Sequence, residues 1–361
     1  MSRTPDVLFV GGGIVGLCAA LAAADRGLHV ALVDDNRPGA ASPSSAGMLG
    51  PSLPGLPESV RDLALTARDL YPEVVVDLAS RSGVRIALDR SGILEIATSA
   101  SELEDGNRGG VARERLDQQQ LAELEPALRA HAGAVHHPRD GWVDNRALME
   151  ALWISVERDP RIQVMRDRVE SVDVSRTGAL VMLSNNTRIE CLRLVVAIGA
   201  WSALAGLRRR ISVRPVKGEL LTLDRCPVRH VVYGDGGYVI PRGHSTIVGA
   251  TSEEASFDTT PTAAGRKFLL GVASALVPTL SDASVFEHWA GIRPVSPDGL
   301  PILGEDVDTP ALVYACGFSR NGVLLAPWAG RALSAMLSGE KTSVIPPEFS
   351  PARIGEINNR S

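Results

Sequence analysis

Three glycines near the N-terminus have the spacing of a turn that can hold a pyrophosphate. Gly11, Gly13 and Gly16 follow the apolar run at residues 7–10 and open an alanine-rich, helix-favouring stretch at residues 14–24. In a turn of this kind the first glycine permits the tight bend, the second lets the phosphates approach the backbone, and the third lets helix and strand pack closely. The phosphates then lie at the positively polarised N-terminus of the helix.

An acidic residue after the second apolar run has the position of a ribose ligand in such a unit. Residues 29–33 form a second apolar run that ends at Asp34, eighteen positions after Gly16. A carboxylate at this place binds the ribose hydroxyls of NAD or FAD and repels a 2′-phosphate, which argues against NADP. Strand, turn, helix, strand and acidic residue follow one another in the order of a dinucleotide-binding unit. The alternative interpretation, in which the glycines serve packing alone, is therefore the weaker one.

The C-terminal part carries a second succession of strand, glycine turn and helix. Arg293 lies just before Pro294, and Arg320 lies in a glycine-containing turn between an apolar strand at residues 311–315 and an apolar helix from Val323. The helix start offers free N–H groups and a partial positive charge, which suits the anionic carbonyl side of a reduced flavin ring.

The elements that position these residues belong to a chain of 361 residues, of which 45% are hydrophobic. This length and this composition predict roughly two domains and exclude a disordered or fibrous protein. The formal net charge is −5 without a long run of one sign, so a nucleic-acid or anionic-membrane partner has no electrostatic support. The cysteines are far apart and form no C-x-x-C pair, which argues against a zinc site or a disulfide framework and fits a reducing cytoplasm. They are Cys18, Cys191, Cys226 and Cys316.

Residues 7–24 are uncharged and apolar and could also be read as a signal peptide. Against that interpretation, Arg3 is offset by Asp6, and three consecutive glycines interrupt what should be a helical apolar core. We therefore expect a cytoplasmic protein. No other stretch approaches the ~18 to 20 apolar residues that a membrane span requires.

Hydrophobic periodicity and turn residues predict a series of further elements. A helix is expected at residues 59–80 with a break at Pro72, and a second helix at residues 144–157 is capped by Asp144. We expect a hairpin from residues 85–88 and 92–96, a polar surface loop at residues 102–110, strands at residues 161–174 and 180–183, and a buried strand at residues 192–198.

Residues 213–289 change to a pattern of strands separated by glycine turns. The strands are expected at residues 219–223, 231–233, 238–242 and 246–250. This pattern predicts an antiparallel sheet inserted between two parts of an α/β domain, with the ligand in the crevice at the carboxyl ends of the parallel strands. The segment from Gly199 to Trp201 then gives a second backbone approach to the cofactor, which flavoproteins often have.

With these segments together, the chain resembles the glycine oxidase group of the D-amino acid oxidase flavoproteins, including the thiamine-pathway enzyme of that type. The resemblance spans nearly the whole length. It rests on the segments 11–34, 46–49, 140–144, 199–202, 214–219, 238–242, 249–254, 291–304 and 320–327.

The resemblance implies a two-domain α/β fold with a glutathione-reductase-type Rossmann FAD-binding domain and an inserted antiparallel-sheet substrate domain. The FAD-binding domain would be discontinuous and would take residues 1–80, 141–212 and 290–361, and the substrate-binding domain would take residues 81–140 and 213–289. The cofactor would be FAD, bound non-covalently, because the related sarcosine oxidases attach flavin through a cysteine where this chain has none. Cys316 lies nearby in sequence and is expected to be an inert strand-end thiol.

The resemblance also assigns roles to single residues. Arg293 would bind the substrate carboxylate, Tyr238 would support it, and Arg320 would line the region of flavin and substrate. Cofactor contacts would come from Gly11, Gly13, Ile14, Val15, Gly16, Asp34, Asp35, Ala46, Gly47, Met48, Val169, Gly199, Trp201, Arg293, Arg320, Asn321, Gly322 and Val323. No residue is assigned to a metal.

Two departures from the family affect the substrate. Many relatives have a histidine after the glycine of the last turn, where this chain has Phe318 and then Ser319. The segment 51–57 is also more proline-rich and apolar than the equivalent active-site loop, which allows a substrate larger or less polar than glycine.

The implied reaction is oxidation of glycine, sarcosine or a small D-amino acid by hydride transfer to the flavin. The products would be an imine, then an oxo acid with ammonia or an amine, and hydrogen peroxide from oxygen. A dehydrogenase that passes electrons to a quinone or a protein, and a flavin-binding protein without turnover, stay open as alternatives. A homo-oligomer is compatible with the sequence.

Overall fold

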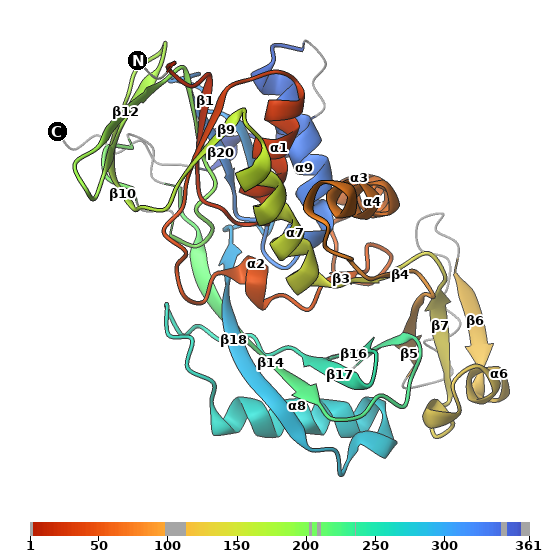
Figure 1. Ribbon diagram of the computed structural model, residues 1–361. Coiled ribbons are helices and arrows are strands. Elements are labelled where there is room, and N and C mark those ends of the chain that lie inside the picture. Colours follow the sequence, from red (N-terminus) through yellow and green to blue (C-terminus); the bar gives the residue numbers. More distant parts are fainter. Residues whose placement is uncertain are drawn as a thin grey trace.

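The computed structural model describes residues 3–97, 113–201, 204–207, 211–234, 236–340 and 345–354 (Figure 1). Its central feature is a six-stranded sheet in the order β19-β20-β13-β1-β2-β9, parallel except for β19. The strands are β1 (Val7–Val10), β2 (Val30–Val33), β9 (Ile162–Met165), β13 (Arg193–Val196), β19 (Ile302–Glu305) and β20 (Leu312–Cys316).

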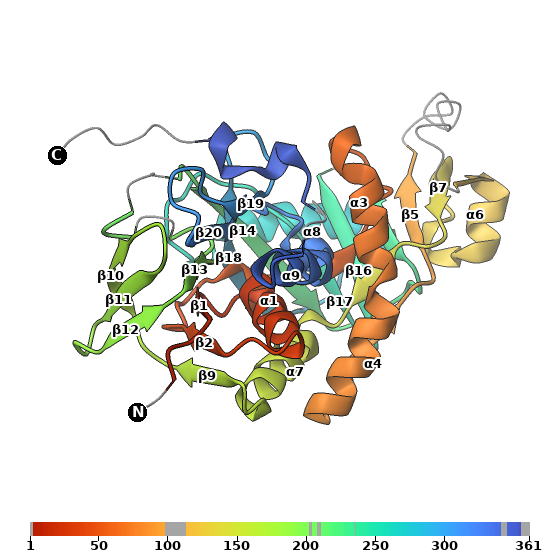
Figure 2. The ribbon, with the colours of Figure 1, turned by 90° about the horizontal axis from the view of Figure 1, so that it is seen from above.

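Each face of this sheet is covered by a different layer, which explains why β1 is apolar at every position. Val7 and Phe9 pack toward the helices α1 (Ile14–Asp25), α7 (Asn145–Arg158) and α9 (Gly322–Leu337). Leu8 and Val10 pack toward an antiparallel sheet of β10 (Val169–Val174), β11 (Ala179–Leu183) and β12 (Arg188–Cys191). Figure 2 shows the helices and this small sheet on opposite sides of the parallel strands.

Two helices lie beside this core. α3 (Glu58–Asp69) packs on α9, and α4 (Tyr71–Ser82) packs on α7. The helical segment therefore breaks just before Pro72, as the sequence predicts. A small sheet of β3 (Met48–Leu49), β8 (Gly141–Val143) and β4 (Leu88–Asp89) links this region to the second large sheet.

The second large sheet has eight strands in the order β18-β14-β17-β16-β15-β5-β7-β6, antiparallel except for the pair β15 and β5. α8 (Ala263–Leu276) packs on one face through Leu269, Val272 and Leu276, and the other face is turned toward the six-stranded sheet (Figure 1). The strands are β5 (Ile93–Ile96), β6 (Glu114–Asp117), β7 (Gly133–His137), β14 (Arg214–Leu223), β15 (Val231–Gly234), β16 (Gly237–Arg242), β17 (Ser245–Gly249) and β18 (Val285–Val295). The short helix α6 (Gln118–Leu124) follows β6.

Several expectations from the sequence are wrong. Residues 85–88 and 92–96 form no hairpin, because β4 pairs with β8 while β5 pairs with β15 and β7. The strand expected at residues 161–174 is two strands in different sheets. Helix α8 was missed among the strands of the second sheet, although Thr262 caps it by accepting a hydrogen bond from the Gly265 N–H.

The loop expected at residues 102–110 lies outside the described residues. The division into two domains stays a prediction, and β18 runs unbroken across its boundary at residue 290. No helix in the described ranges is long and apolar enough to cross a membrane.

A buried ion pair fixes the segment between β3 and α3. Nη1 of Arg68 lies 2.6 Å from Oδ1 of Asp140, and the two side chains are 3% and 0% exposed. The N–H and the hydroxyl of Ser52 both donate to the same carboxylate at 3.0 Å. The pair therefore anchors the start of the proline-rich segment 51–57.

We predict that Asp140→Ala lowers the free energy of unfolding by about 3–5 kcal/mol, because the buried Arg68 would lose its buried partner and keep only the partly exposed Asp69 carboxylate, 3.0 Å from its Nε. Glu73→Ala removes the exposed ion pair with Arg331 and is the control, which should leave stability almost unchanged. Urea unfolding of both variants measures the difference. Equal small losses would contradict the anchoring role.

Candidate functional site

A cavity of about 820 Å³ runs along the carboxyl ends of the parallel strands and reaches the inner face of the eight-stranded sheet. Its walls come from the turn between β1 and α1, the end of β2, the short helix α2 (Ala41–Ser44), the start of α9, and strands β14, β16 and β18. The residues that the sequence assigns to cofactor and substrate all line this cavity except Gly16. Segments more than 300 residues apart thus meet in the predicted crevice.

Each of the three glycines in the first turn has a different physical reason for lacking a side chain. Gly11 has a φ of +109°, and a Cβ there would lie 2.4 Å from the carbonyl oxygen of Ala197. A Cβ on Gly16 would lie 2.0 Å from the carbonyl oxygen of Gly11, so Gly16 serves the packing of helix on turn. A Cβ on Gly13 would meet only the Ser42 hydroxyl, at 3.2 Å, and no other neighbour. Gly13 therefore borders open cavity, where a bound phosphate would need the space.

The Asp34 carboxylate is held against the glycine turn. It accepts hydrogen bonds from the Gly12 N–H at 2.6 Å and from the Asn36 N–H at 2.9 Å. Asp34 and Asp35 line the same end of the cavity as the glycines, which is the arrangement that ribose binding requires.

Sequence reasoning missed the serines of α2 and the residue that follows it. The Ser42 hydroxyl accepts a hydrogen bond from the Ile14 N–H at 2.9 Å, at the first turn of α1. Ser44 and Ser45 also line the cavity. The cluster of serines at residues 42–45, in the segment between the second strand and β3, was the available signal, since small hydroxyl side chains suit the surroundings of a phosphate.

Other predicted cofactor residues form the side walls. Val169 lies at the start of β10, and Gly199 and Trp201 follow β13. The Trp201 ring stacks on Phe257 at a centroid distance of 5.4 Å. Ala46, Gly47 and Met48 form a further wall, where Gly47 has a φ of +76° and a Cβ would lie 2.1 Å from the Val143 carbonyl oxygen.

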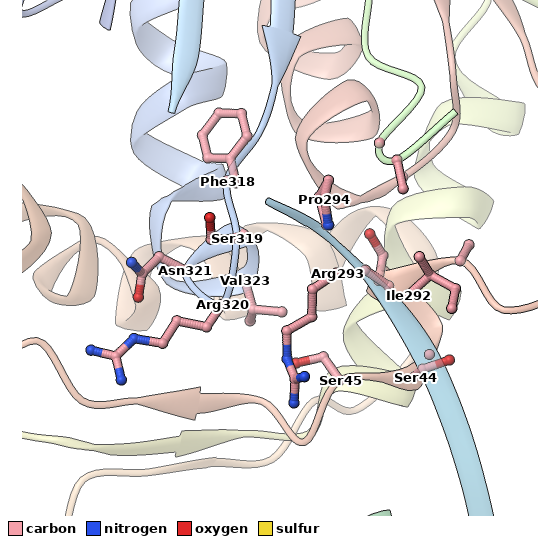
Figure 3. Close-up of a pocket in the computed structure, with 18 of the residues that line it drawn as sticks. Ser44, Ser45, Ile292, Arg293, Pro294, Phe318, Ser319, Arg320, Asn321 and Val323 are labelled. Atoms are coloured by element: carbon pink, nitrogen blue, oxygen red, sulfur yellow. The ribbon is translucent and has the colours of Figure 1, made fainter. Parts of the chain in front are cut away.

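Arg293 is the central residue of the other end of the cavity (Figure 3). Its guanidinium lies flat against Gly218, where a Cβ would be 2.3 Å from Nη2. Nη1 donates to the carbonyl oxygens of Thr251 at 2.9 Å and Lys217 at 3.3 Å. Within the described part of the chain no carboxylate pairs with Arg293, so donors of this fixed cation stay free for an anion.

The surroundings of Arg293 are desolvated and positive. Burial lowers the pKa of Arg293, and the charge of Arg320 acts in the same direction. Burial also raises the pKa of Tyr238, against the opposing charges of Arg293 and Arg242, so its hydroxyl stays protonated. No histidine lines the cavity within the described ranges. The arrangement can hold and orient a carboxylate, and its described residues offer no imidazole as a general base.

The turn before α9 closes this end. Arg320 donates to the Pro54 carbonyl oxygen at 3.0 Å and so contacts the proline-rich segment, whose Leu53 and Leu56 line the cavity. Ser319 has a φ of +50°, and its hydroxyl is buried without a hydrogen-bond partner. Asn321 precedes α9 but does not cap it with its side chain, so the first N–H groups of α9 stay free beside Gly322 and Val323.

These features fit an extended dinucleotide with a redox-active ring. The glycine turn and Asp34 could hold the pyrophosphate and ribose, and the uncapped start of α9 and the Ser319 hydroxyl could contact the ring near Arg293. Cys316 also lines the cavity, but burial raises the pKa of its thiol to about 12, which keeps it from acting as a nucleophile.

Comparison with known proteins also indicates an FAD-dependent oxidoreductase. Residues 6–336 match the family model described as FAD dependent oxidoreductase (DAO). The chain is 33% identical to a glycine oxidase of Geobacillus kaustophilus over 381 aligned positions that cover 99% of each protein. It is 31% identical to the bifunctional protein ThiO/ThiG of Trichormus variabilis, with 97% of this chain and 55% of that protein covered. The crystal structure of glycine oxidase from Geobacillus kaustophilus has a TM-score of 0.89 at 32% identity and covers 97% of this chain and 98% of its own.

We predict that Gly13→Val abolishes FAD binding and leaves the fold intact, because the new side chain would occupy the space of the phosphates and its Cβ would meet only the Ser42 hydroxyl. Gly16→Val should instead impair folding, and Gly271→Val, on open surface of α8, should bind FAD normally. The FAD released on denaturation, per mole of protein, and the unfolding temperature of each apoprotein are the measurements. FAD retained by Gly13→Val would place the pyrophosphate elsewhere.

Proposed function

The chain belongs to the family of FAD-dependent oxidoreductases, and we propose that it oxidises a small amino acid or N-substituted amino acid at the carbon that bears the amine. The observation that carries this proposal is the partly buried Arg293 guanidinium, which is fixed by carbonyl oxygens and has no carboxylate partner among the described residues. A desolvated cation of this kind suits a substrate carboxylate.

We assign the roles as follows. Arg293 would bind the carboxylate through its free donors, and the protonated Tyr238 hydroxyl would add a further hydrogen bond. Gly218 and the Thr251 carbonyl would keep the guanidinium in one orientation, which fixes the α-hydrogen of the substrate relative to the flavin. FAD, when bound, supplies the acceptor for the hydride. Because no general base lines this end, the amine would lose its proton to solvent.

We further propose that the imine is hydrolysed in water to an oxo acid and ammonia or an amine, and that oxygen takes the electrons to give hydrogen peroxide. The glycine oxidase relatives support an oxidase over a quinone-linked or protein-linked dehydrogenase. FAD would be held without a covalent bond, since the Cys316 thiol is not activated. The free cysteines of the described chain support a cytoplasmic location, and the ThiO/ThiG relative supports a place in thiamine biosynthesis.

An anaerobic screen tests the proposal. Glycine, sarcosine and small D-amino acids should bleach the flavin absorbance, and amines that lack a carboxylate and hydroxy acids should not. D-Alanine and larger D-amino acids then test the apolar wall at Leu53 and Leu56. If no amino acid bleaches the flavin, the proposed function is wrong. Peroxide measured after readmission of air distinguishes an oxidase from a dehydrogenase.

We predict that Arg293→Ala raises KM about 10- to 100-fold, which corresponds to loss of a charge-assisted hydrogen-bonded pair. Arg293→Lys should recover little, because an ammonium cannot make the same two parallel bonds. Arg214→Ala is the control, since Arg214 pairs with Glu254 at the surface outside the cavity. Steady-state kinetics give the comparison, and an unchanged KM in Arg293→Ala would move the carboxylate site elsewhere.

We also predict that the rate of flavin reduction rises with pH and then reaches a plateau. Only the neutral amine can release a hydride, and the positive field of Arg293 and Arg320 disfavours an ammonium and so lowers the pKa of the bound amine. The Tyr238 pKa is raised, so this hydroxyl does not titrate in the working range. Stopped-flow reduction with two substrates of different amine pKa should give two different midpoints. One shared midpoint that moves on mutation of a side chain would reveal a protein base.

A further inference from the structure

Helix α9 contains a proline in its interior, and this leaves a carbonyl without its helical partner. Pro327 has no backbone N–H, so it cannot donate to the carbonyl of Val323, four residues earlier. Val323 lies in the first turn of α9 and is buried. A buried carbonyl without a donor is costly, and native structures almost always provide one.

Tyr71 provides the missing donor. Its hydroxyl donates a hydrogen bond to the Val323 carbonyl oxygen from a residue that is 252 positions away in sequence. Tyr71 lies at the break between α3 and α4, and its side chain is fully buried. Burial raises the pKa of this hydroxyl well above its usual value, so it stays a donor at every working pH.

The turn that Tyr71 holds borders the cavity. Gly322 and Val323 line the cavity beside Arg293 and Arg320. The helices α7 and α8 begin with a side-chain cap, from Asp144 and Thr262, whereas the side chain of Asn321 leaves the first N–H groups of α9 free. The positively polarised end of α9 is thus available to a ligand, while the carbonyl side of the same turn is bonded to Tyr71.

We propose that Tyr71 is a positioning residue for the flavin: its hydroxyl replaces the N–H that Pro327 lacks and so fixes the first turn of α9 with its free N–H groups directed into the cavity. This inference rests on the proposed function only in assigning that end of the cavity to the redox-active ring. Without the Tyr71 hydroxyl the Val323 carbonyl is unpaired, and the turn must shift to find a donor.

A double-mutant cycle tests the proposal, with the FAD-loaded protein and its apoprotein. Tyr71→Phe should raise the Kd for FAD about tenfold and shift the visible absorption bands and the reduction potential of the bound flavin. Pro327→Ala restores a backbone N–H within the helix. In that background the same Tyr71→Phe change should alter the Kd less than about twofold.

Each outcome of the cycle bears on the proposal. If Tyr71→Phe lowers only the unfolding temperature, with the Kd, spectrum and potential unchanged, Tyr71 is structural and the proposal is overturned. An equal rise in Kd in both backgrounds also overturns it, because the effect would not act through the Val323 carbonyl. If Tyr71→Phe alone does not fold, recovery of FAD-binding protein by adding Pro327→Ala supports the proposal, and failure to recover it is evidence against.

The cycle is independent of turnover. It measures FAD affinity, the flavin spectrum and the flavin potential, and these can be read even if no amino acid reduces the wild-type protein. Failure of the proposed function would therefore leave the test of Tyr71 intact.

Discussion

The partly buried guanidinium of Arg293 is the constraint on which the cavity depends, because a cation withdrawn from water needs acceptors and space that the rest of the fold must supply. β14 supplies both. Gly218 leaves room for the guanidinium, and the carbonyl of Lys217 accepts from it. Since side chains alternate along a strand, Lys217 and Glu219 point to the opposite face. There Nζ of Lys217 lies 3.0 Å from Oε1 of Glu219, and Glu219 accepts from Thr262, the residue that caps α8. Three consecutive residues thus join the Arg293 end of the cavity to the outer helix α8.

At the opposite end of the cavity, backbone groups rather than charged side chains form most of the site. Gly11 allows the first turn to approach the strand β13, and Gly13 keeps the cavity open in front of α1. α1 and α9 both start at this cavity without a cap from their own N-cap side chains. Free N–H groups at helix starts are suited to negative groups, the phosphates at one end and the flavin carbonyls at the other. The cavity therefore has a backbone-lined end, which we assign to the cofactor phosphates, and an arginine-lined end, which we propose for the substrate carboxylate.

Local patterns in the sequence were sufficient for the elements that form by themselves. The strand, glycine turn and helix from Val7 onward, and the helix capped by Asp144, are encoded by residues close together in the chain. The hairpin expected from residues 85–88 and 92–96 failed because strand partners are chosen by the sheet as a whole, where β5 finds β15 from a distant segment. α8 was missed because its residues lie between strands of similar hydrophobicity. The helix covers one face of the eight-stranded sheet, and this need for a cover is visible only in the tertiary structure.

The sequence by itself determined the dinucleotide turn with Asp34 through spacing and residue type, and its resemblance to a known family pointed to FAD and to Arg293 as the candidate carboxylate ligand. Only the tertiary structure decided which groups hold them in place. The carbonyl of Thr251 that fixes Arg293, and the Tyr71 hydroxyl that replaces the N–H missing at Pro327 within α9, come from elements with no local relation to their partners. Such contacts depend on how separate elements pack together, and a linear pattern of hydrophobic and polar residues does not specify that packing.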